Sequence, residues 1–111
     1  MNQRLKTSDE LENFGRFSEP ALLILVSLAE GPKHGYSMTE DIESIAGVRL
    51  GPGTLYGAIA RLESRGLIKP LPTDERRNPY ELTTSGEQVL RARLAAMMAV
   101  AKVGQRRLAS A

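Results

Sequence analysis

Apolar residues recur at helical spacing in three stretches of the first two thirds of the chain. Residues 22–29 are apolar on almost every side, which predicts a helix at the centre of the core. Residues 37–46 keep apolar side chains on one face and acids on the other. Residues 52–65 begin at a proline and end before a glycine, as helices often do. We therefore expect three helices joined by short turns.

The second and third predicted helices contain residues that specify how they start and pack. Ser37 and Glu40 have the spacing of a capping box, so we expect Ser37 to cap the second helix. The apolar face of that helix consists of Met38, Ile42 and Ile45. The apolar arc of the third helix consists of Leu55, Ala58, Ile59 and Leu62. We expect both sets to face the core.

The hydrophobic period changes after Gly66. Residues 67–71 predict a short edge strand, because Pro70 cannot donate a hydrogen bond to a neighbouring strand. Residues 80–83 predict the return strand, and the polar, turn-rich residues 72–79 connect the two. A two-stranded hairpin of this size is not stable alone, so it must pack on the helices.

The last stretch predicts one long helix from about Gly86 to Arg107, capped by Ser85. Six apolar or small residues along it are spaced 4, 3, 4, 3 and 4 apart, which is the pattern of a heptad seam. These seam residues are Leu90, Leu94, Met97, Ala101, Gly104 and Leu108. A helix flanked by so many lysines and arginines cannot bury this seam within one small domain. The seam therefore predicts a homodimer.

Together these elements predict an α+β, mostly helical fold: a winged helix-turn-helix domain followed by a long C-terminal dimerisation helix. We assign residues 18–83 to the winged domain and residues 84–111 to the dimerisation helix. For the N-terminal extension, residues 1–17, a short helix and a frayed tail fit the pattern equally well.

Composition narrows the class of partner. The 111-residue chain has no cysteine, which excludes disulfides and fits a reducing cytoplasm. It has no evident signal peptide and no apolar run of the roughly 20 residues that cross a bilayer, so we expect a cytoplasmic protein without membrane contact. The net charge is only +2, but residues 52–111 contain ten bases against five acids, whereas residues 1–51 contain five against eight. An anionic partner would meet the second half.

The side of the third helix that faces away from the core is small. It consists of Gly53, Gly57, Ala60, Arg61 and Ser64. Glycine in a helix costs up to about 1 kcal/mol relative to alanine, so two outward glycines suggest close approach by a large partner. The major groove of B-DNA is roughly 12 Å wide and accepts one helix. There the N–H groups of Gly53 and Thr54 would meet a phosphate or a base. Tyr56 and Arg61 would add contacts to phosphate, sugar or guanine. For this helix alone, a surface with nothing bound is an equal alternative.

The loop between the predicted strands has a basic tip, formed by Arg76, Arg77 and Asn78. Beside a helix in the major groove, such a tip would contact flanking phosphates or the minor groove. Asp74 and Glu75 are adjacent to the arginines, so a solvated turn is the alternative for the loop by itself. The preceding helices favour the DNA contact, because the third helix of such a unit enters the groove.

Three motifs resemble the PadR-type transcriptional regulators of bacteria. They are His34-Gly35-Tyr36, Gly53-Thr54-Leu55-Tyr56, and Arg76-Arg77 ahead of Tyr80-Glu81-Leu82-Thr83 and Gly86. The resemblance covers roughly residues 18–90. It implies a repressor that dimerises through its C-terminal helix and is often released by a small ligand, and it favours Tyr36 as a phosphate contact. Gly57 departs from the family's usual proline, and a single C-terminal helix resembles its short subgroup.

Other chemistry is not indicated. His34 is the only histidine, and with no cysteine present it lacks partners for a zinc site. No acid, base and nucleophile lie at catalytic spacing, so we expect neither an enzyme nor a cofactor. We predict a sequence-specific regulator of transcription that binds double-stranded DNA as a homodimeric repressor on an inverted repeat, with a small-molecule effector as a further partner. The alternative is a winged helix that docks another protein without binding specific DNA.

Overall fold

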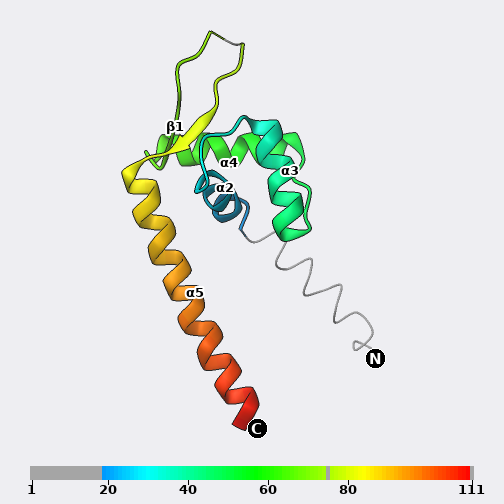
Figure 1. The fold of residues 1–111 in the computed structure, drawn as a ribbon, viewed down its shortest axis with the longest axis vertical. Helices are drawn as coiled ribbons and strands as arrows, with labels where there is room; N and C mark the ends of the chain where they lie inside the picture. Colours follow the sequence, from blue (N-terminus) through cyan, green and yellow to red (C-terminus); the bar gives the residue numbers. More distant parts are fainter. Residues whose placement is uncertain (1–18, 75, 111) are drawn as a thin grey trace.

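The computed structural model describes residues 19–74 and 76–110, so the predicted extension over residues 1–17 lies outside the described residues. The elements are α2 (Pro20–Leu28), α3 (Gly35–Ala46), α4 (Pro52–Ser64), β1 (Ile68–Pro70), β2 (Tyr80–Leu82) and α5 (Thr84–Ser110). Figure 1 shows α2 between α3, α4 and the sheet, with the β1–β2 loop projecting at one end and α5 at the other. The predicted α+β, mostly helical winged fold with a long C-terminal helix is confirmed.

The core is built around α2, whose sequence leaves no polar face. Its buried apolar residues are Leu22, Ile24, Leu25 and Leu28. The predicted arc of α4 is also buried, and it consists of Leu55, Ala58, Ile59 and Leu62. On α3, Met38 and Ile42 are buried as expected, but Ile45 is 52% exposed, so that prediction is wrong. Val48 and Leu50, which follow α3, are buried and fill the core beyond its last turn instead.

The sheet connects the hairpin to the helices. β1 and β2 pair antiparallel, with Ile68 opposite Leu82 and Pro70 opposite Tyr80. On its other side, β2 exchanges two backbone hydrogen bonds with Lys33: the Lys33 N–H donates to the Tyr80 carbonyl at 3.0 Å, and the Tyr80 N–H donates to the Lys33 carbonyl at 2.9 Å. β2 is therefore central and β1 lies at the edge, where a proline is tolerated.

Two helices begin earlier than their predicted caps. His34 is the N-cap residue of α3, so Ser37 lies inside the first turn and the prediction of a Ser37 cap is wrong. α5 begins directly after Thr83, whose Oγ1 accepts a hydrogen bond from the Gly86 N–H at 3.0 Å. The prediction of a Ser85 cap is therefore also wrong. Several residues at this junction have side chains that can cap a helix, so the sequence alone does not select one of them. The turn after β2 places Thr83, and not Ser85, before the first free N–H groups of the helix.

Candidate nucleic-acid interface

The face of α4 opposite its buried arc is directed to solvent, because the core holds the helix by the other side. Gly53, Thr54 and Ser64 are exposed along it, whereas Gly57 is half-buried. A side-chain carbon placed on Gly57 would lie 3.7 Å from Nη1 of Arg61, so the Arg61 guanidinium folds back along the helix toward this glycine. The face is therefore narrow at its N-terminal end and carries the cation of Arg61 further along.

Two aromatic side chains stand at the N-terminal ends of α3 and α4. The Tyr56 ring of α4 reaches across the first residue of α3: a side-chain carbon on Gly35 would lie 2.9 Å from Cζ of Tyr56. The absence of a side chain at Gly35 therefore permits this crossing. Tyr36, the next residue, is 65% exposed.

Two hollows flank Tyr56. The first, of about 600 Å³, lies between the starts of α3 and α4 and includes Tyr36, Tyr56 and Arg77 in its lining. The second, of about 450 Å³, lies between α4 and the hairpin and is lined by Gly35, Tyr56, Arg76, Arg77, Asn78 and Tyr80. Tyr56 and Arg77 border both hollows. The fold thus brings the basic loop tip to the same side of the molecule as the N-terminal end of α4, although some 20 residues separate them in sequence.

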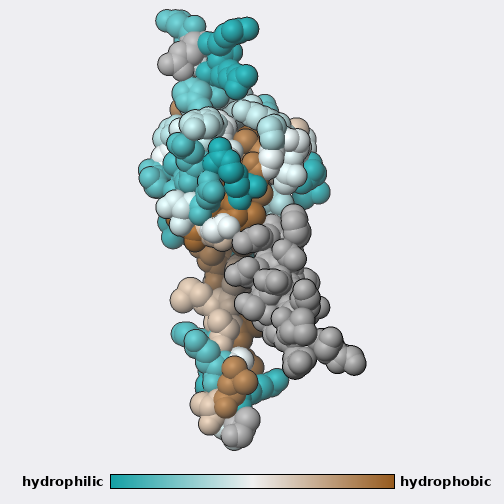
Figure 2. Space-filling view, turned by 90° about the vertical axis from the view of Figure 1, so that its right-hand side faces the viewer, coloured by the Kyte–Doolittle hydropathy of each residue, from teal (hydrophilic) through white to brown (hydrophobic). Residues whose placement is uncertain are grey.

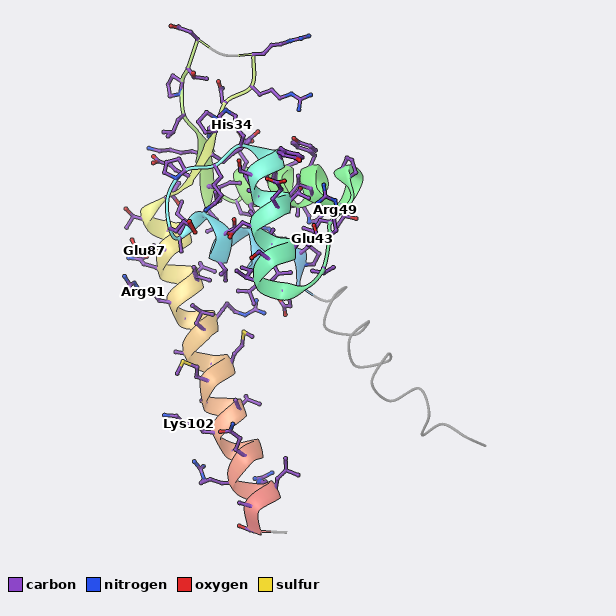
Figure 3. The ribbon with its side chains drawn as sticks, turned by 45° about the vertical axis from the view of Figure 1, so that its right-hand side comes forward. His34, Glu43, Arg49, Glu87, Arg91 and Lys102 are labelled. Atoms are coloured by element: carbon purple, nitrogen blue, oxygen red, sulfur yellow. The ribbon has the colours of Figure 1, made fainter. Side chains whose placement is uncertain are left out.

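Arg49 also lines the first hollow, and the sequence analysis did not identify it. Its Nη1 donates a hydrogen bond to Oε1 of Glu43 at 2.7 Å, and this bond raises the pKa of Arg49 above its usual value (Figure 3). The only sequence signal for a role of Arg49 is its position. It is a cation two residues before Gly51, the N-cap residue of α4.

A partly buried polar cluster holds the turn between α2 and α3 in place. The Lys33 ammonium donates to the carbonyl of Ser27 at 2.6 Å and lies 3.8 Å from Oδ2 of Asp41. The Ser27 hydroxyl donates to the same Asp41 oxygen at 2.7 Å. Because the backbone of Lys33 also pairs with Tyr80, this group fixes the hairpin relative to α3. Burial raises the pKa of Tyr80, with Glu63 and Tyr56 adding to the effect, so its hydroxyl stays neutral.

The predicted seam residues lie on α5, and of these six residues only the first is buried. Leu90 packs against the core, whereas Leu94, Met97, Ala101, Gly104 and Leu108 are exposed. Figure 2 shows hydrophobic and hydrophilic side chains together along this rod, and mainly hydrophilic ones over the hairpin at the opposite end. Over residues 19–74 and 76–110, no group of three or more potential metal ligands occurs, and no helix is long and apolar enough to span a membrane.

Residues 24–92 match the family described as "Transcriptional regulator PadR-like family". The chain belongs to this family. PadR-like regulators generally bind DNA, and they are regulators of transcription rather than enzymes. The resemblance expected from the three motifs is thereby confirmed.

Solved structures of PadR-like and other regulators share the fold. A PadR family regulator from Clostridium difficile R20291 superposes with a TM-score of 0.73 at 28% identity, over 80% of this chain and 97% of that one. A transcriptional regulator from Clostridium thermocellum has a TM-score of 0.68 at 29% identity, over 78% and 87% of the two chains. A PadR-like regulator from Bacillus cereus, at 17% identity, shows the fold alone, with a TM-score of 0.70 over 79% and 89%.

A curated relative is longer than this chain. It is an uncharacterized 37.1 kDa protein of transposon Tn4556 from Streptomyces fradiae, 47% identical over 75 residues. The match covers 68% of this chain but only 22% of the relative.

Proposed function

We propose that this PadR-like protein is a sequence-specific DNA-binding regulator that acts as a repressor on an inverted-repeat operator. One observation carries the proposal: the N-terminal part of α4 and the basic hairpin tip meet at two adjoining hollows, with Tyr56 and Arg77 lining both and Arg76 lining the second. A helix and a basic loop arranged in this way can engage a major groove and the adjacent backbone together.

The residues divide into groups that position the protein and groups that read bases. The N–H groups of Gly53 and Thr54 stand at the positive end of α4 and suit a phosphate or a base acceptor. Tyr36 and Tyr56 offer hydroxyls to phosphates beside the groove. Further along α4, Arg61 can extend from its position over Gly57 toward a guanine edge.

The hairpin supplies backbone contacts. Arg76, Arg77 and Asn78 are exposed at its tip and face the flanking duplex when α4 enters the groove. Arg49 adds a further cation at the start of α4, provided that it exchanges Glu43 for a phosphate. Such contacts strengthen binding to every sequence and set its salt dependence.

The active unit in this proposal is a homodimer that pairs through α5. From Leu94 onward its seam is exposed, with no cover from the part of the chain that the structure describes, and a symmetric pair would present two α4 helices to half-sites about 34–36 Å apart, or a multiple of that. The operator is then an inverted repeat. A small effector that binds between the α5 helices would release the DNA, and the exposed methionines there suit an adaptable site.

Salt-dependent DNA binding tests the proposal. Removing a phosphate contact with Arg76→Ala should weaken binding to operator and random duplexes alike, and should reduce the slope of log K against log salt by about 0.9. Removing a base contact with Arg61→Ala should cost about 1–3 kcal/mol on the operator and less on random DNA. Fluorescence anisotropy over a salt series measures both effects.

The matched control is Lys102→Ala, which removes one exposed positive charge from α5, far from α4. It should leave affinity and slope nearly unchanged. If the wild-type protein binds no duplex with measurable salt dependence, the proposed DNA-binding function is wrong. The alternative function, a winged helix that docks another protein, then takes its place. If Arg61→Ala weakened binding to operator and random DNA equally, Arg61 would not contact a base.

A further inference from the structure

The connection between α3 and α4 presents one cation outward. Val48 and Leu50 are buried in the core, so the backbone is anchored on both sides of Arg49, which is exposed. The Nη1 atom of Arg49 donates a hydrogen bond to Oε1 of Glu43 at 2.7 Å. Figure 3 shows these two side chains next to each other, one from α3 and one from the segment that follows it. The core therefore holds Arg49 beside the start of α4, with Glu43 as its partner.

The ion pair between Arg49 and Glu43 is easily exchanged. The two side chains are 52% and 50% exposed, so water and salt screen their attraction. Exposed ion pairs of this kind contribute little to stability. An anion that found a second partner in the protein would therefore displace the Glu43 carboxylate from Arg49 at little cost.

The first hollow beside Tyr56 offers such a second partner. Arg49 borders this hollow, of about 600 Å³, together with Arg77 of the hairpin. Arg77 is exposed and forms no ion pair with residues 19–74 or 76–110. The other polar side chains of the lining are hydroxyls, those of Tyr36, Thr39 and Tyr56. Two guanidinium groups thus border one space, and the described residues that line it include no carboxylate.

The charge of this lining indicates the class of ligand. The hollow of about 420 Å³ at the base of α5 has the opposite balance, with one guanidinium, that of Arg91, against three carboxylates, those of Glu30, Glu81 and Glu87. Two guanidinium groups on one space suit a phosphate group, because its oxygens can accept charged hydrogen bonds from both groups at once. The first hollow therefore suits a phosphate and the hollow at the base of α5 does not.

We propose that the first hollow holds one phosphate group between Arg49 and Arg77, and that Glu43 competes with this phosphate for Arg49. The inference rests on the proposed function, because the phosphate is that of a DNA strand beside the groove that receives α4. One phosphate then links the segment before α4 to the tip of the hairpin. Glu43 has the opposite effect, since it weakens binding to every duplex by occupying Arg49 in the free protein.

A shared phosphate makes a distinctive prediction for the salt dependence of binding. The slope of log K against log salt reports the number of phosphates neutralised, about 0.9 for each. Arg49→Ala and Arg77→Ala should each lower affinity about two- to fivefold, but each should leave the slope almost unchanged, because the other arginine still neutralises the phosphate. The double variant should reduce the slope by about 0.9. If each single variant reduced the slope by about 0.9 and the double variant by about 1.8, the two arginines would contact separate phosphates and the shared site would be wrong.

Arg76 provides the matched control for the shared contact. It is the neighbour of Arg77 at the hairpin tip, but it lines the second hollow and not the first. Arg76→Ala alone should therefore reduce the slope by about 0.9, and adding Arg49→Ala should not reduce it further. Loss of a second phosphate in this combination would show that Arg49 acts without Arg77, and would also overturn the shared site.

Glu43→Gln tests the competition for Arg49. It keeps the shape of the side chain and removes the charge that holds Arg49, so affinity for operator and random duplexes should rise about two- to fivefold at low salt. Of the described residues, only Glu43 forms an ion pair with Arg49, so Glu40, which is also exposed on α3, reports the loss of a negative charge alone. In an Arg49→Ala background, Glu43→Gln should have no more effect than Glu40→Gln. A gain from Glu43→Gln that persists without Arg49 would overturn the competition.

Inorganic phosphate distinguishes the two sources of the ligand. It is titrated against the full chain without DNA and followed by tyrosine fluorescence, because the chain has three tyrosines, two of which line the hollow, and no tryptophan. A signal that the double variant of Arg49 and Arg77 loses would support the site and show that it also takes free phosphate. A response to duplex alone would support a site for strand phosphates only.

Failure of the inference and failure of the proposed function give different results. A wild-type protein that binds no duplex would overturn the proposed function, and the strand phosphate with it. A wild-type protein that binds duplex, while the double variant of Arg49 and Arg77 keeps the wild-type affinity and slope, would overturn this inference alone. Fluorescence anisotropy over a salt series measures both quantities for every variant.

Discussion

At the scale of single residues, two glycines allow elements to approach more closely than any side chain would permit. At Gly35 the neighbour is the flexible ring of Tyr56, which can move aside. At Gly86 the neighbour is backbone: an added side-chain carbon would overlap the carbonyl oxygen of Leu67 and lie 3.3 Å from Cδ2 of Leu82. Gly86 therefore decides how closely α5 packs on the hairpin, and through it how the hairpin is placed beside α4.

This difference predicts the effect of adding one methyl group. Gly86→Ala should lower the free energy of unfolding by about 1–3 kcal/mol, because neither the Leu67 carbonyl nor the helix can move without loss of packing. Urea unfolding followed by circular dichroism measures it. Gly53→Ala is the matched control, since the space around Gly53 is open and alanine is the better helix former. A Gly86→Ala protein as stable as the control would contradict the backbone overlap.

At the scale of elements, Thr83 joins the end of α4 to the start of α5. Its hydroxyl donates to the carbonyl of Gly66 at 2.7 Å and accepts from the Gly86 N–H at 3.0 Å. Its own N–H donates to the Leu67 carbonyl at 3.1 Å. One residue thus caps α5 and holds the turn after α4, so the direction of the long helix is tied to the orientation of α4.

Loss of this cap should be measurable in the free energy of unfolding. Thr83→Ala should cost about 1 kcal/mol, and up to about 2 kcal/mol if the bond to Gly66 is also lost. Ser85→Ala provides the comparison: Ser85 is exposed inside the first turn of α5, and its replacement should change stability by less than about 0.5 kcal/mol. If Ser85→Ala lowered the free energy of unfolding more than Thr83→Ala in chemical denaturation, Ser85 would be the cap of α5 after all.

At the scale of the whole molecule, the protein consists of a compact winged domain with a rod projecting from it, 57 Å along its longest axis and 22 Å along its shortest. The rod carries a continuous apolar stretch, residues 95–101, which is exposed on every side. Such a surface is large for a monomer and is typical of an interface. Stability of the molecule should therefore depend on its own concentration.

Thermal unfolding checks this dependence. In a folded dimer that unfolds to separate chains, Tm should rise by about 3 °C for each tenfold increase in protein concentration. Leu108→Asp should remove most of this rise, because it weakens the pair without touching the core. A Tm that is independent of concentration from micromolar to near-millimolar protein would rule out coupling between folding and pairing.

The sequence by itself determined which segments are helices and which side of α4 is buried, because hydrophobic period reports burial directly. The almost unbroken apolar run of α2 likewise indicated that this helix lies in the core. The sequence also indicated the family, since the motifs lie in short contiguous stretches. It did not determine where α3 and α5 begin, because several capping residues compete locally and only the path of the chain out of the preceding turn selects one. The exposure of Ile45 and the role of Arg49 likewise depend on contacts with segments elsewhere in the chain. The tertiary structure alone placed Arg77 beside Tyr56, because that proximity depends on β2 pairing with Lys33, a hydrogen-bonded contact between residues 47 positions apart.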